Sequence, residues 1–189
     1  MSFDPDKLQP SDVGAVAWTH PPFLCSGYFN PGTSSVGRLM TFAFRTPVHA
    51  TVTKIYHCGL AGAGLSNCFL GIYASSQNGG SLLAGSADMS ASWVTSNAYA
   101  ATLSKAVDLI PGVPYRVGVL MGAATTAWQF WAASSTATSG YQNNLGAPDG
   151  SKYASAIGPA GSLTALPAYY DHTTMTQGLG FPTFVMTAT

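Results

Sequence analysis

The chain has 189 residues, of which 47% are hydrophobic and 7% are charged, and seven Lys and Arg side chains balance seven aspartates. This length and apolar content predict one domain with a well-packed core, while the lack of net charge disfavours binding to nucleic acid or to an anionic membrane. Glutamate is absent and Gly, Ser, Thr and Ala abound, so a mainly β structure is expected. So few charges also favour a surface partly covered by other chains, and we expect a homo-oligomer.

The first residues, MSFDPDKLQPSDVG, lack the charged and apolar regions of a secretory signal, and no apolar stretch approaches the length of a membrane span. We therefore expect a protein that is made in the cytoplasm without membrane insertion. The cysteines Cys25, Cys58 and Cys68 lack the spacing of a zinc site. Cys58 and Cys68 flank the glycine-rich loop GLAGAGLSN, where a disulfide across a hairpin and two buried thiols are both open.

Residues 1–36 lack periodicity, and repeated prolines keep resetting their backbone toward extended or turn conformations. The segment carries too many aromatic side chains for a solvated tail, so we expect an arm that contacts its own domain or a neighbouring subunit. The candidate contact residues are Trp18, Phe23, Tyr28 and Phe29. Fully stretched, such an arm would reach on the order of 100 Å at about 3.3 Å per residue.

From residue 37 onward the sequence alternates between apolar and polar residues. The runs at 39–44 and 48–57 predict a first antiparallel pair of strands. Residues 68–75 and 81–88 predict two further strands that are joined by a hairpin at QNGG, where Asn78 and Gly79 tolerate the positive φ of a tight turn.

The segment LSKAVDLIPGVPYRVGVLM, residues 103–121, predicts two strands joined by a corner at Pro111, Gly112 and Pro114. In the second strand Val117 and its alternate neighbours share one face and Arg116 lies on the other, which is typical of a half-buried strand. We expect this segment to carry the chain across the corner of a sandwich.

Residues 128–134 add a strand in which Trp128 and Trp131 face opposite sides. Residues of about 135–180 predict a long irregular loop with a functional or interfacial role, and residues 181–187 predict a last strand. Short strands at regular intervals without helical crossovers predict an all-β fold. We expect an antiparallel β-sandwich of jelly-roll type over residues 37–189, preceded by the extended arm of residues 1–36.

The sequence holds no pattern that selects a catalytic or metal site. It has no G-x-S-x-G, its four histidines lack metal-binding spacing, and its aspartates do not select the facing pair that a glycosidase needs. We therefore expect no enzyme, no catalytic residue, no metal site and no cofactor. Asp171 and His172 form an acid–imidazole pair in the late loop, either functional or an ordinary loop pair.

Aromatic side chains are better candidates for recognition, because flat rings stack on sugar faces or anchor protein interfaces at a modest entropy cost. The candidate residues for glycan or partner contact are Trp93, Trp131, Tyr169 and Tyr170. Core packing stays open for Trp131, and subunit contact stays open for the two tyrosines.

Three segments carry a family resemblance: GIYASSQNGGSLLAGSAD (71–88), VDLIPGVPYRVGVLM (107–121) and LPAYYDHTTMTQGLGFPTF (166–184). Together they resemble the jelly-roll domains of virion structural proteins in tailed actinobacterial phages, of the minor tail or decoration type. The similarity covers roughly residues 37–187 and its residues are structural, so it specifies the fold better than the role.

The resemblance implies a virion protein at the tail tip or on the capsid surface. It also implies other virion proteins as partners, assembly as a homotrimer and a contribution to host attachment. This hypothesis predicts that residues 1–36 lie on another chain. The alternative is a non-catalytic, lectin-like module that binds a cell-surface glycan, and it predicts an outward aromatic pair beside Asn or Asp in a shallow groove.

Overall fold

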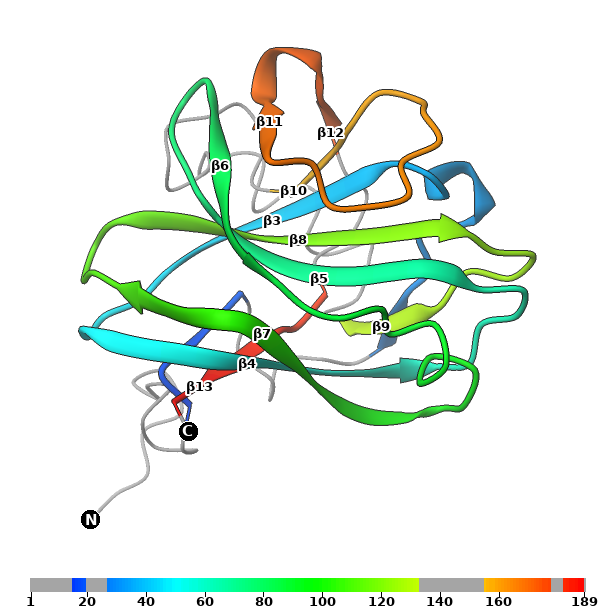
Figure 1. The fold of residues 1–189 in the computed structure, drawn as a ribbon, viewed down its shortest axis with the longest axis horizontal. Helices are drawn as coiled ribbons and strands as arrows, with labels where there is room; N and C mark the ends of the chain where they lie inside the picture. The colour runs from blue at the N-terminus through cyan, green and yellow to red at the C-terminus, as the bar shows by residue number, and fades with distance from the viewer. Residues whose placement is uncertain (1–14, 20–26, 133–154, 178–181, 189) are drawn as a thin grey trace.

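The computed structural model describes residues 15–19, 27–132, 155–177 and 182–188 (Figure 1). In these ranges all strand pairs are antiparallel, and they form two curled sheets. Sheet A has the order β1 (Ala17–Trp18), β13 (Val185–Thr187), β4 (Ala50–Leu60), β9 (Gln129–Ala132) and β2 (Gly27–Phe29), with β7 (Asn97–Leu109) paired to β4. Sheet B has the order β11 (Tyr169–Asp171), β6 (Gly79–Gly85), β5 (Ser66–Ala74), β8 (Pro114–Ala123), β3 (Leu39–Arg45), β10 (Ser155–Ile157) and β12 (Thr176–Gln177). The predicted all-β fold is therefore confirmed.

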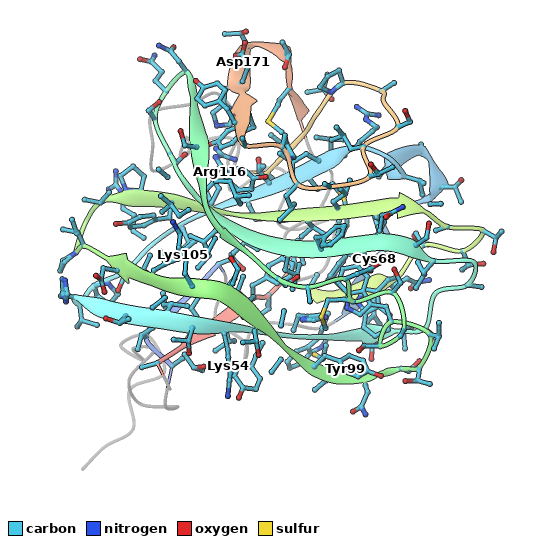
Figure 2. All side chains as sticks on the ribbon, viewed as in Figure 1. Lys54, Cys68, Tyr99, Lys105, Arg116 and Asp171 are labelled. Carbon is cyan, nitrogen blue, oxygen red and sulfur yellow. The ribbon has the colours of Figure 1, made fainter. Side chains whose placement is uncertain are left out.

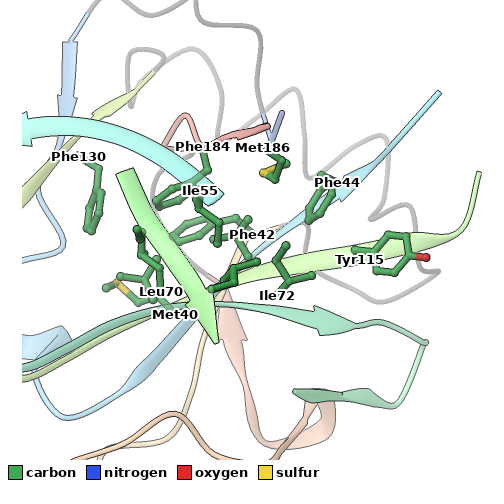
Figure 3. Close-up of a cluster of buried hydrophobic side chains, with 14 of the residues drawn as sticks. Met40, Phe42, Phe44, Ile55, Leu70, Ile72, Tyr115, Phe130, Phe184 and Met186 are labelled. Carbon is green, nitrogen blue, oxygen red and sulfur yellow. The ribbon is translucent and has the colours of Figure 1, made fainter. Parts of the chain in front are cut away.

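The main core lies between the two sheets. It is built from the inward side chains of alternating strand positions, among them Phe42 of β3, Leu70 of β5 and Ile55 of β4 (Figure 3). Phe42 packs against Phe184, with ring centroids 5.7 Å apart, so the segment before β13 closes the core. Burial of these large apolar side chains is the main source of stability.

The predicted pairing of the first two runs is wrong. β3 lies between β8 and β10 in sheet B, whereas β4 pairs with β7, β13 and β9 in sheet A. The two strands face each other across the core rather than share hydrogen bonds. Apolar alternation shows which side of a strand is inward, but it does not distinguish a partner in the same sheet from a neighbour in the facing sheet.

The strand–corner–strand prediction for residues 103–121 is confirmed. β7 lies in sheet A and β8 lies in sheet B, so the corner carries the chain from one sheet to the other. Gly112 occupies a left-handed conformation with φ of 74°, and its backbone N–H donates to the Thr46 carbonyl at 3.1 Å. The corner is thus held against the connection between β3 and β4.

Replacing Gly112 with alanine is expected to lower the free energy of unfolding by about 1–2 kcal/mol. A Cβ atom at this position meets nothing within 4 Å, so the cost comes from the backbone alone. Gly112→Asn should lose less, because asparagine tolerates positive φ better. Urea denaturation of the three proteins measures the difference, and an equal loss in both variants would contradict a backbone origin.

The strand β8 is buried on both faces, which differs from the half-buried strand that its alternation predicted. Val117 and Val119 enter the main core, whereas Arg116 on the opposite face is also fully buried and its Nη1 donates to the Thr41 hydroxyl at 3.2 Å. Residues 158–168 connect β10, which lies between β3 and β12, to β11 at the far edge of the sheet, and they pass over the outer face on the way. A strand pattern cannot reveal a distant segment that covers its polar side.

The covering segment of residues 158–168 packs on the outer face of sheet B through Leu163 and Leu166, and a second, smaller core lies there. Its buried members are Leu39, Tyr73, Ala156, Tyr170 and Met175. The Tyr73 hydroxyl donates to the Pro167 carbonyl at 2.9 Å, which ties the covering segment to β5. The late loop is therefore not irregular in its described part: residues 155–177 contain β10, β11, β12 and a 3-10 turn at His172–Thr174.

The described part of the N-terminal arm belongs to sheet A. β1 pairs with β13 and β2 pairs with β9, so residues 17–18 and 27–29 pair within their own chain. Phe29 is buried in the main core, with its ring 6.2 Å from that of Phe42. The prediction that the arm lies on another chain is therefore wrong for these residues. After β2, a second 3-10 turn follows at Thr33–Ser35. Phe23 and Cys25 lie outside the described residues.

The hairpin between β5 and β6 is confirmed, although its turn differs in detail. Ser76 and Gly79 form the bridge that closes it, and the positive φ of 143° falls on Gly79 rather than on Asn78. No disulfide joins Cys58 to Cys68. They lie on β4 and β5, in different sheets, so the glycine-rich loop joins the two layers and does not form a hairpin.

Candidate functional site

The first concave region lies on the outer side of sheet B and is called the Tyr169 pocket. It has a volume of about 340 Å³, and its walls come from β3, the crossing segment, β11 and the 3-10 turn after it. Its lining is mostly apolar, with Leu39, Leu163 and Met175 among the walls and Tyr169 and Asp171 as polar members. Figure 2 shows Asp171 at the upper edge of the molecule, at the end of β11. The predicted residues Tyr169 and Tyr170 thus come together with Asp171 in one pocket.

Tyr169 and Tyr170 have different roles in this pocket. Their rings stack with centroids 6.3 Å apart and an interplanar angle of 20°. Tyr169 is 54% exposed, whereas Tyr170 is buried in the second core and its hydroxyl lies 2.7 Å from the Ser75 hydroxyl. Tyr170 therefore supports the exposed ring of Tyr169, which is the one of the two that is free to contact a ligand.

Asp171 is an ionised acceptor at the rim of the pocket. Hydrogen bonds from the Thr173 hydroxyl and from the Thr173 backbone N–H, both at 2.8 Å to Oδ1, hold the pKa of Asp171 below its ordinary value. This contact also caps the 3-10 turn at His172–Thr174. Among the described residues that line the pocket, Asp171 is the one carboxylate. An exposed ring beside a hydrogen-bond acceptor is an arrangement that can bind a ligand with an apolar face and a donor group.

The second concave region lies on the outer side of sheet A and is called the Trp131 groove. It has a volume of about 400 Å³ and is lined by Tyr28, Cys58, Gly59, Leu60, Ser96, Asn97 and Trp131. Tyr28 of β2 and Trp131 of β9 are directly opposite each other in the antiparallel pair, so both side chains lie on the same face. A smaller hollow of about 120 Å³ continues from the groove, shares Cys58 and Trp131 with it and adds Tyr56.

A buried aromatic cluster lies beneath this groove. Trp93 stacks on Trp128 with ring centroids 5.8 Å apart, and its indole N–H donates to Nε2 of His57 at 2.7 Å. Burial lowers the pKa of His57 from 6.5 to about 4, while a hydrogen bond with the backbone of Ile55 opposes the shift. His57 is therefore a neutral acceptor in the core at physiological pH.

Trp93 is fully buried, so the structure removes it from the candidate contact residues. The segment before it folds inward because Oδ1 of Asp88 accepts backbone hydrogen bonds from Cys68 and Ser90, both at 2.9 Å. The polar connection of residues 88–97 suggested an exposed ring. No signal in the sequence indicated the burial of this ring, because no alternation in this loop fixes the direction of its side chains.

Trp128 and Trp131 lie on opposite faces, as the alternation predicted: Trp128 and Phe130 face the core, whereas Trp131 is half-buried and faces outward. Tyr28, predicted as an arm contact, lies opposite Trp131 instead. The sequence did not point to Ser96 or Asn97, because both stand in a polar stretch where nothing distinguishes one side chain from another. For Trp18 the structure describes the backbone in β1 and not the side chain.

In the described part of the chain, no three His, Cys, Asp or Glu side chains cluster as metal ligands would. The helices described are short 3-10 turns, and none is long or apolar enough to cross a membrane.

No model of a known protein family matches the chain. The search of curated proteins likewise gave no significant sequence match.

Proposed function

We propose that this chain is a structural protein of a phage virion, a jelly-roll domain that is attached to the particle at the tail tip or on the capsid surface. The observation that carries the proposal is that the resembling segments are neighbours in space. The segments 71–88 and 107–121 supply β6, most of β8 and residues 71–74 of β5, and the segment 166–184 supplies β11, so these four strands are consecutive in sheet B. The segment 166–184 also supplies β12 at the opposite edge of this sheet, and residues 107–109 end β7 in sheet A. Most of the resembling strands therefore lie side by side in one sheet.

The proposal includes other virion proteins as partners, assembly as a homo-oligomer with a trimer favoured, and a contribution to host adsorption. Large apolar side chains that remain exposed support such contacts. Examples in the described residues are Tyr28, Tyr56, Val94, Ile110 and Tyr169. Attachment through residues 15–19 and 27–36 is not part of the proposal, because their strands pair within sheet A.

The test is to find the protein in purified virions. Particles purified on a density gradient should contain this chain at a fixed copy number by quantitative mass spectrometry, and gold-labelled antibodies should decorate one part of the particle. Lysate from the same infection, cleared of particles, is the control. Presence of the chain in the lysate but not in the particles would contradict the proposal.

A second candidate function, non-catalytic glycan binding, is favoured by the Tyr169 pocket. There an exposed ring is held by stacking on Tyr170 and lies beside the acceptor Asp171, in a hollow with apolar walls. The glycan hypothesis predicted an outward aromatic pair beside Asn or Asp, whereas here one of the two rings, Tyr169, is exposed and Tyr170 is buried. An aromatic face binds the apolar C–H face of a sugar, while the carboxylate accepts from its hydroxyls.

Replacing Tyr169 with alanine is expected to weaken binding of a cell-surface glycan by about tenfold or more if this pocket holds the sugar. The measurement is calorimetric titration of the whole chain with polysaccharide released from host cells. Ile110→Ser changes another exposed apolar residue and serves as the control with unchanged affinity. Equal affinity of the Tyr169 variant and the original protein would remove the pocket from consideration.

A further inference from the structure

We propose that the Trp131 groove on sheet A is a separate binding site for a neutral saccharide. The inference rests on the proposed contribution to host adsorption for its biological purpose. Its residues are distinct from those of the Tyr169 pocket, which lies outside the other sheet. The argument combines the aromatic wall, the hydrogen-bonding groups and the charge of the groove.

The aromatic wall comes from two neighbouring strands of sheet A. Tyr28 and Trp131 are paired residues of β2 and β9, and 48% of Tyr28 is exposed. Paired residues on one face of an antiparallel sheet have their Cβ atoms about 5 Å apart, so their side chains form one continuous surface. Both strands are anchored from behind by the buried rings of Phe29 and Phe130. The wall is therefore held rigidly, which lowers the entropy cost of binding.

Opposite this wall the groove supplies neutral hydrogen-bonding groups. The Asn97 side chain accepts through Oδ1 from the backbone N–H of Ala98 at 2.8 Å, and among the described residues its Nδ2 makes no hydrogen bond. The Ser96 hydroxyl accepts from the backbone N–H of Ala61 at 3.0 Å and keeps its own hydrogen to donate. Amide and hydroxyl donors beside an aromatic wall match the hydroxyl groups and the C–H faces of a sugar.

The charge of the groove selects a neutral ligand. Among the described residues that line the groove there is no Lys, Arg, Asp, Glu or His, so these residues supply no counter-charge for a phosphate, a sulfated glycan or a basic peptide. Its volume of about 400 Å³ lies in the range of about 300–1,000 Å³ that small-molecule sites occupy. The hollow beside Tyr56 extends the same face and offers room for an adjoining sugar unit.

The experiment begins with the whole chain on an array of immobilised neutral oligosaccharides of hexoses and pentoses. The best oligosaccharide is then titrated into the original protein and its variants by calorimetry. Trp131→Ala and Tyr28→Ala should each raise the dissociation constant by about tenfold or more, while Trp131→Phe should retain most of the affinity because it keeps a ring. Asn97→Asp, which removes the Nδ2 donors at an exposed position, should also weaken binding.

Ile110→Ser is the matched control, because it changes an exposed apolar residue outside both concave regions and should leave the affinity unchanged. Tyr169→Ala is titrated in parallel, so that binding in the Tyr169 pocket is distinguished from binding in the Trp131 groove. Circular dichroism and thermal unfolding of each variant separate lost binding from lost folding, and Tyr28 and Asn97 are exposed enough to be replaced if the tryptophan variant does not fold. The inference is overturned if no oligosaccharide on the array binds, if the groove variants bind as the original protein does, or if only Tyr169→Ala loses affinity. Detection of the chain in virions does not depend on these outcomes, so failure of the groove and failure of the virion proposal are distinguishable.

Discussion

Replacing Trp93 with alanine is expected to lower the free energy of unfolding by about 3–5 kcal/mol. The ring is fully buried, stacks on Trp128 and meets Phe130 edge to face, with centroids 5.5 Å apart. The truncation opens a large cavity at the centre of the cluster and also leaves Nε2 of His57 without its donor. Equilibrium denaturation in guanidinium chloride measures the loss.

Two further variants separate the causes of this loss. Val94→Ala changes the next residue along, which is 50% exposed, and should alter the free energy of unfolding by no more than about 0.5 kcal/mol. Trp93→Phe keeps most of the ring but removes the indole N–H, so its cost of about 1–3 kcal/mol reports the unsatisfied His57 acceptor. A Trp93→Ala protein as stable as Val94→Ala would show that this ring does not organise the core.

Acidification from pH 7 to pH 4 is expected to lower the free energy of unfolding by about 3 kcal/mol through His57 alone. Burial holds the pKa of His57 at about 4 in the folded protein, compared with 6.5 when the imidazole is exposed in the unfolded chain. Between these values the unfolded chain binds a proton that the folded protein refuses, so unfolding becomes more favourable as the pH falls. The contribution is therefore fully present above pH 6.5 and is lost as the pH decreases toward 4.

Urea denaturation of the protein at pH 7.0, 5.5 and 4.5 measures this dependence, with the pH values chosen to lie on both sides of about 6.5. His57→Phe removes the titrating group and should flatten the profile over this interval, even though it lowers stability at neutral pH by leaving the Trp93 donor without its acceptor. His49→Gln removes an exposed imidazole and should leave the profile in place. Identical profiles for His57→Phe and the original protein would contradict a role for His57.

The sequence was sufficient to predict the fold class and most strand positions, because alternation and turn residues are local signals. The β5–β6 hairpin and the Pro111–Gly112 corner both follow from such signals. Strand partners were less predictable. β3 and β4 are consecutive in the chain and both alternate, yet they lie in facing sheets, and only the three-dimensional path of the connection decides between the two arrangements.

For the candidate sites too, contacts between residues close in sequence were predicted and contacts between distant strands were not. Tyr169 and Asp171 were found because adjacent residues in a chain stay adjacent in space. Only part of the Trp131 groove was predicted, since Trp131 was a candidate contact residue, whereas its partner Tyr28 is about a hundred residues away and was assigned to the arm. Asn97 was missed for the same reason, because a polar residue becomes part of a site only through the distant strands that are brought to it.

Because of the second core outside sheet B, the residues that line the Tyr169 pocket can change without disturbing the main core between the sheets. The covering segment is held to the sheet by the second core, whose buried residues are Leu39, Tyr73, Ala156, Tyr170 and Met175. The described residues that line the pocket are not members of the main core, and the two are connected only through strand β3. Substitutions in residues 158–168 can therefore change the shape and the chemistry of the pocket at little cost to the packing between the sheets. A domain built in this way can acquire new binding partners by exchanging one surface segment while its scaffold stays the same.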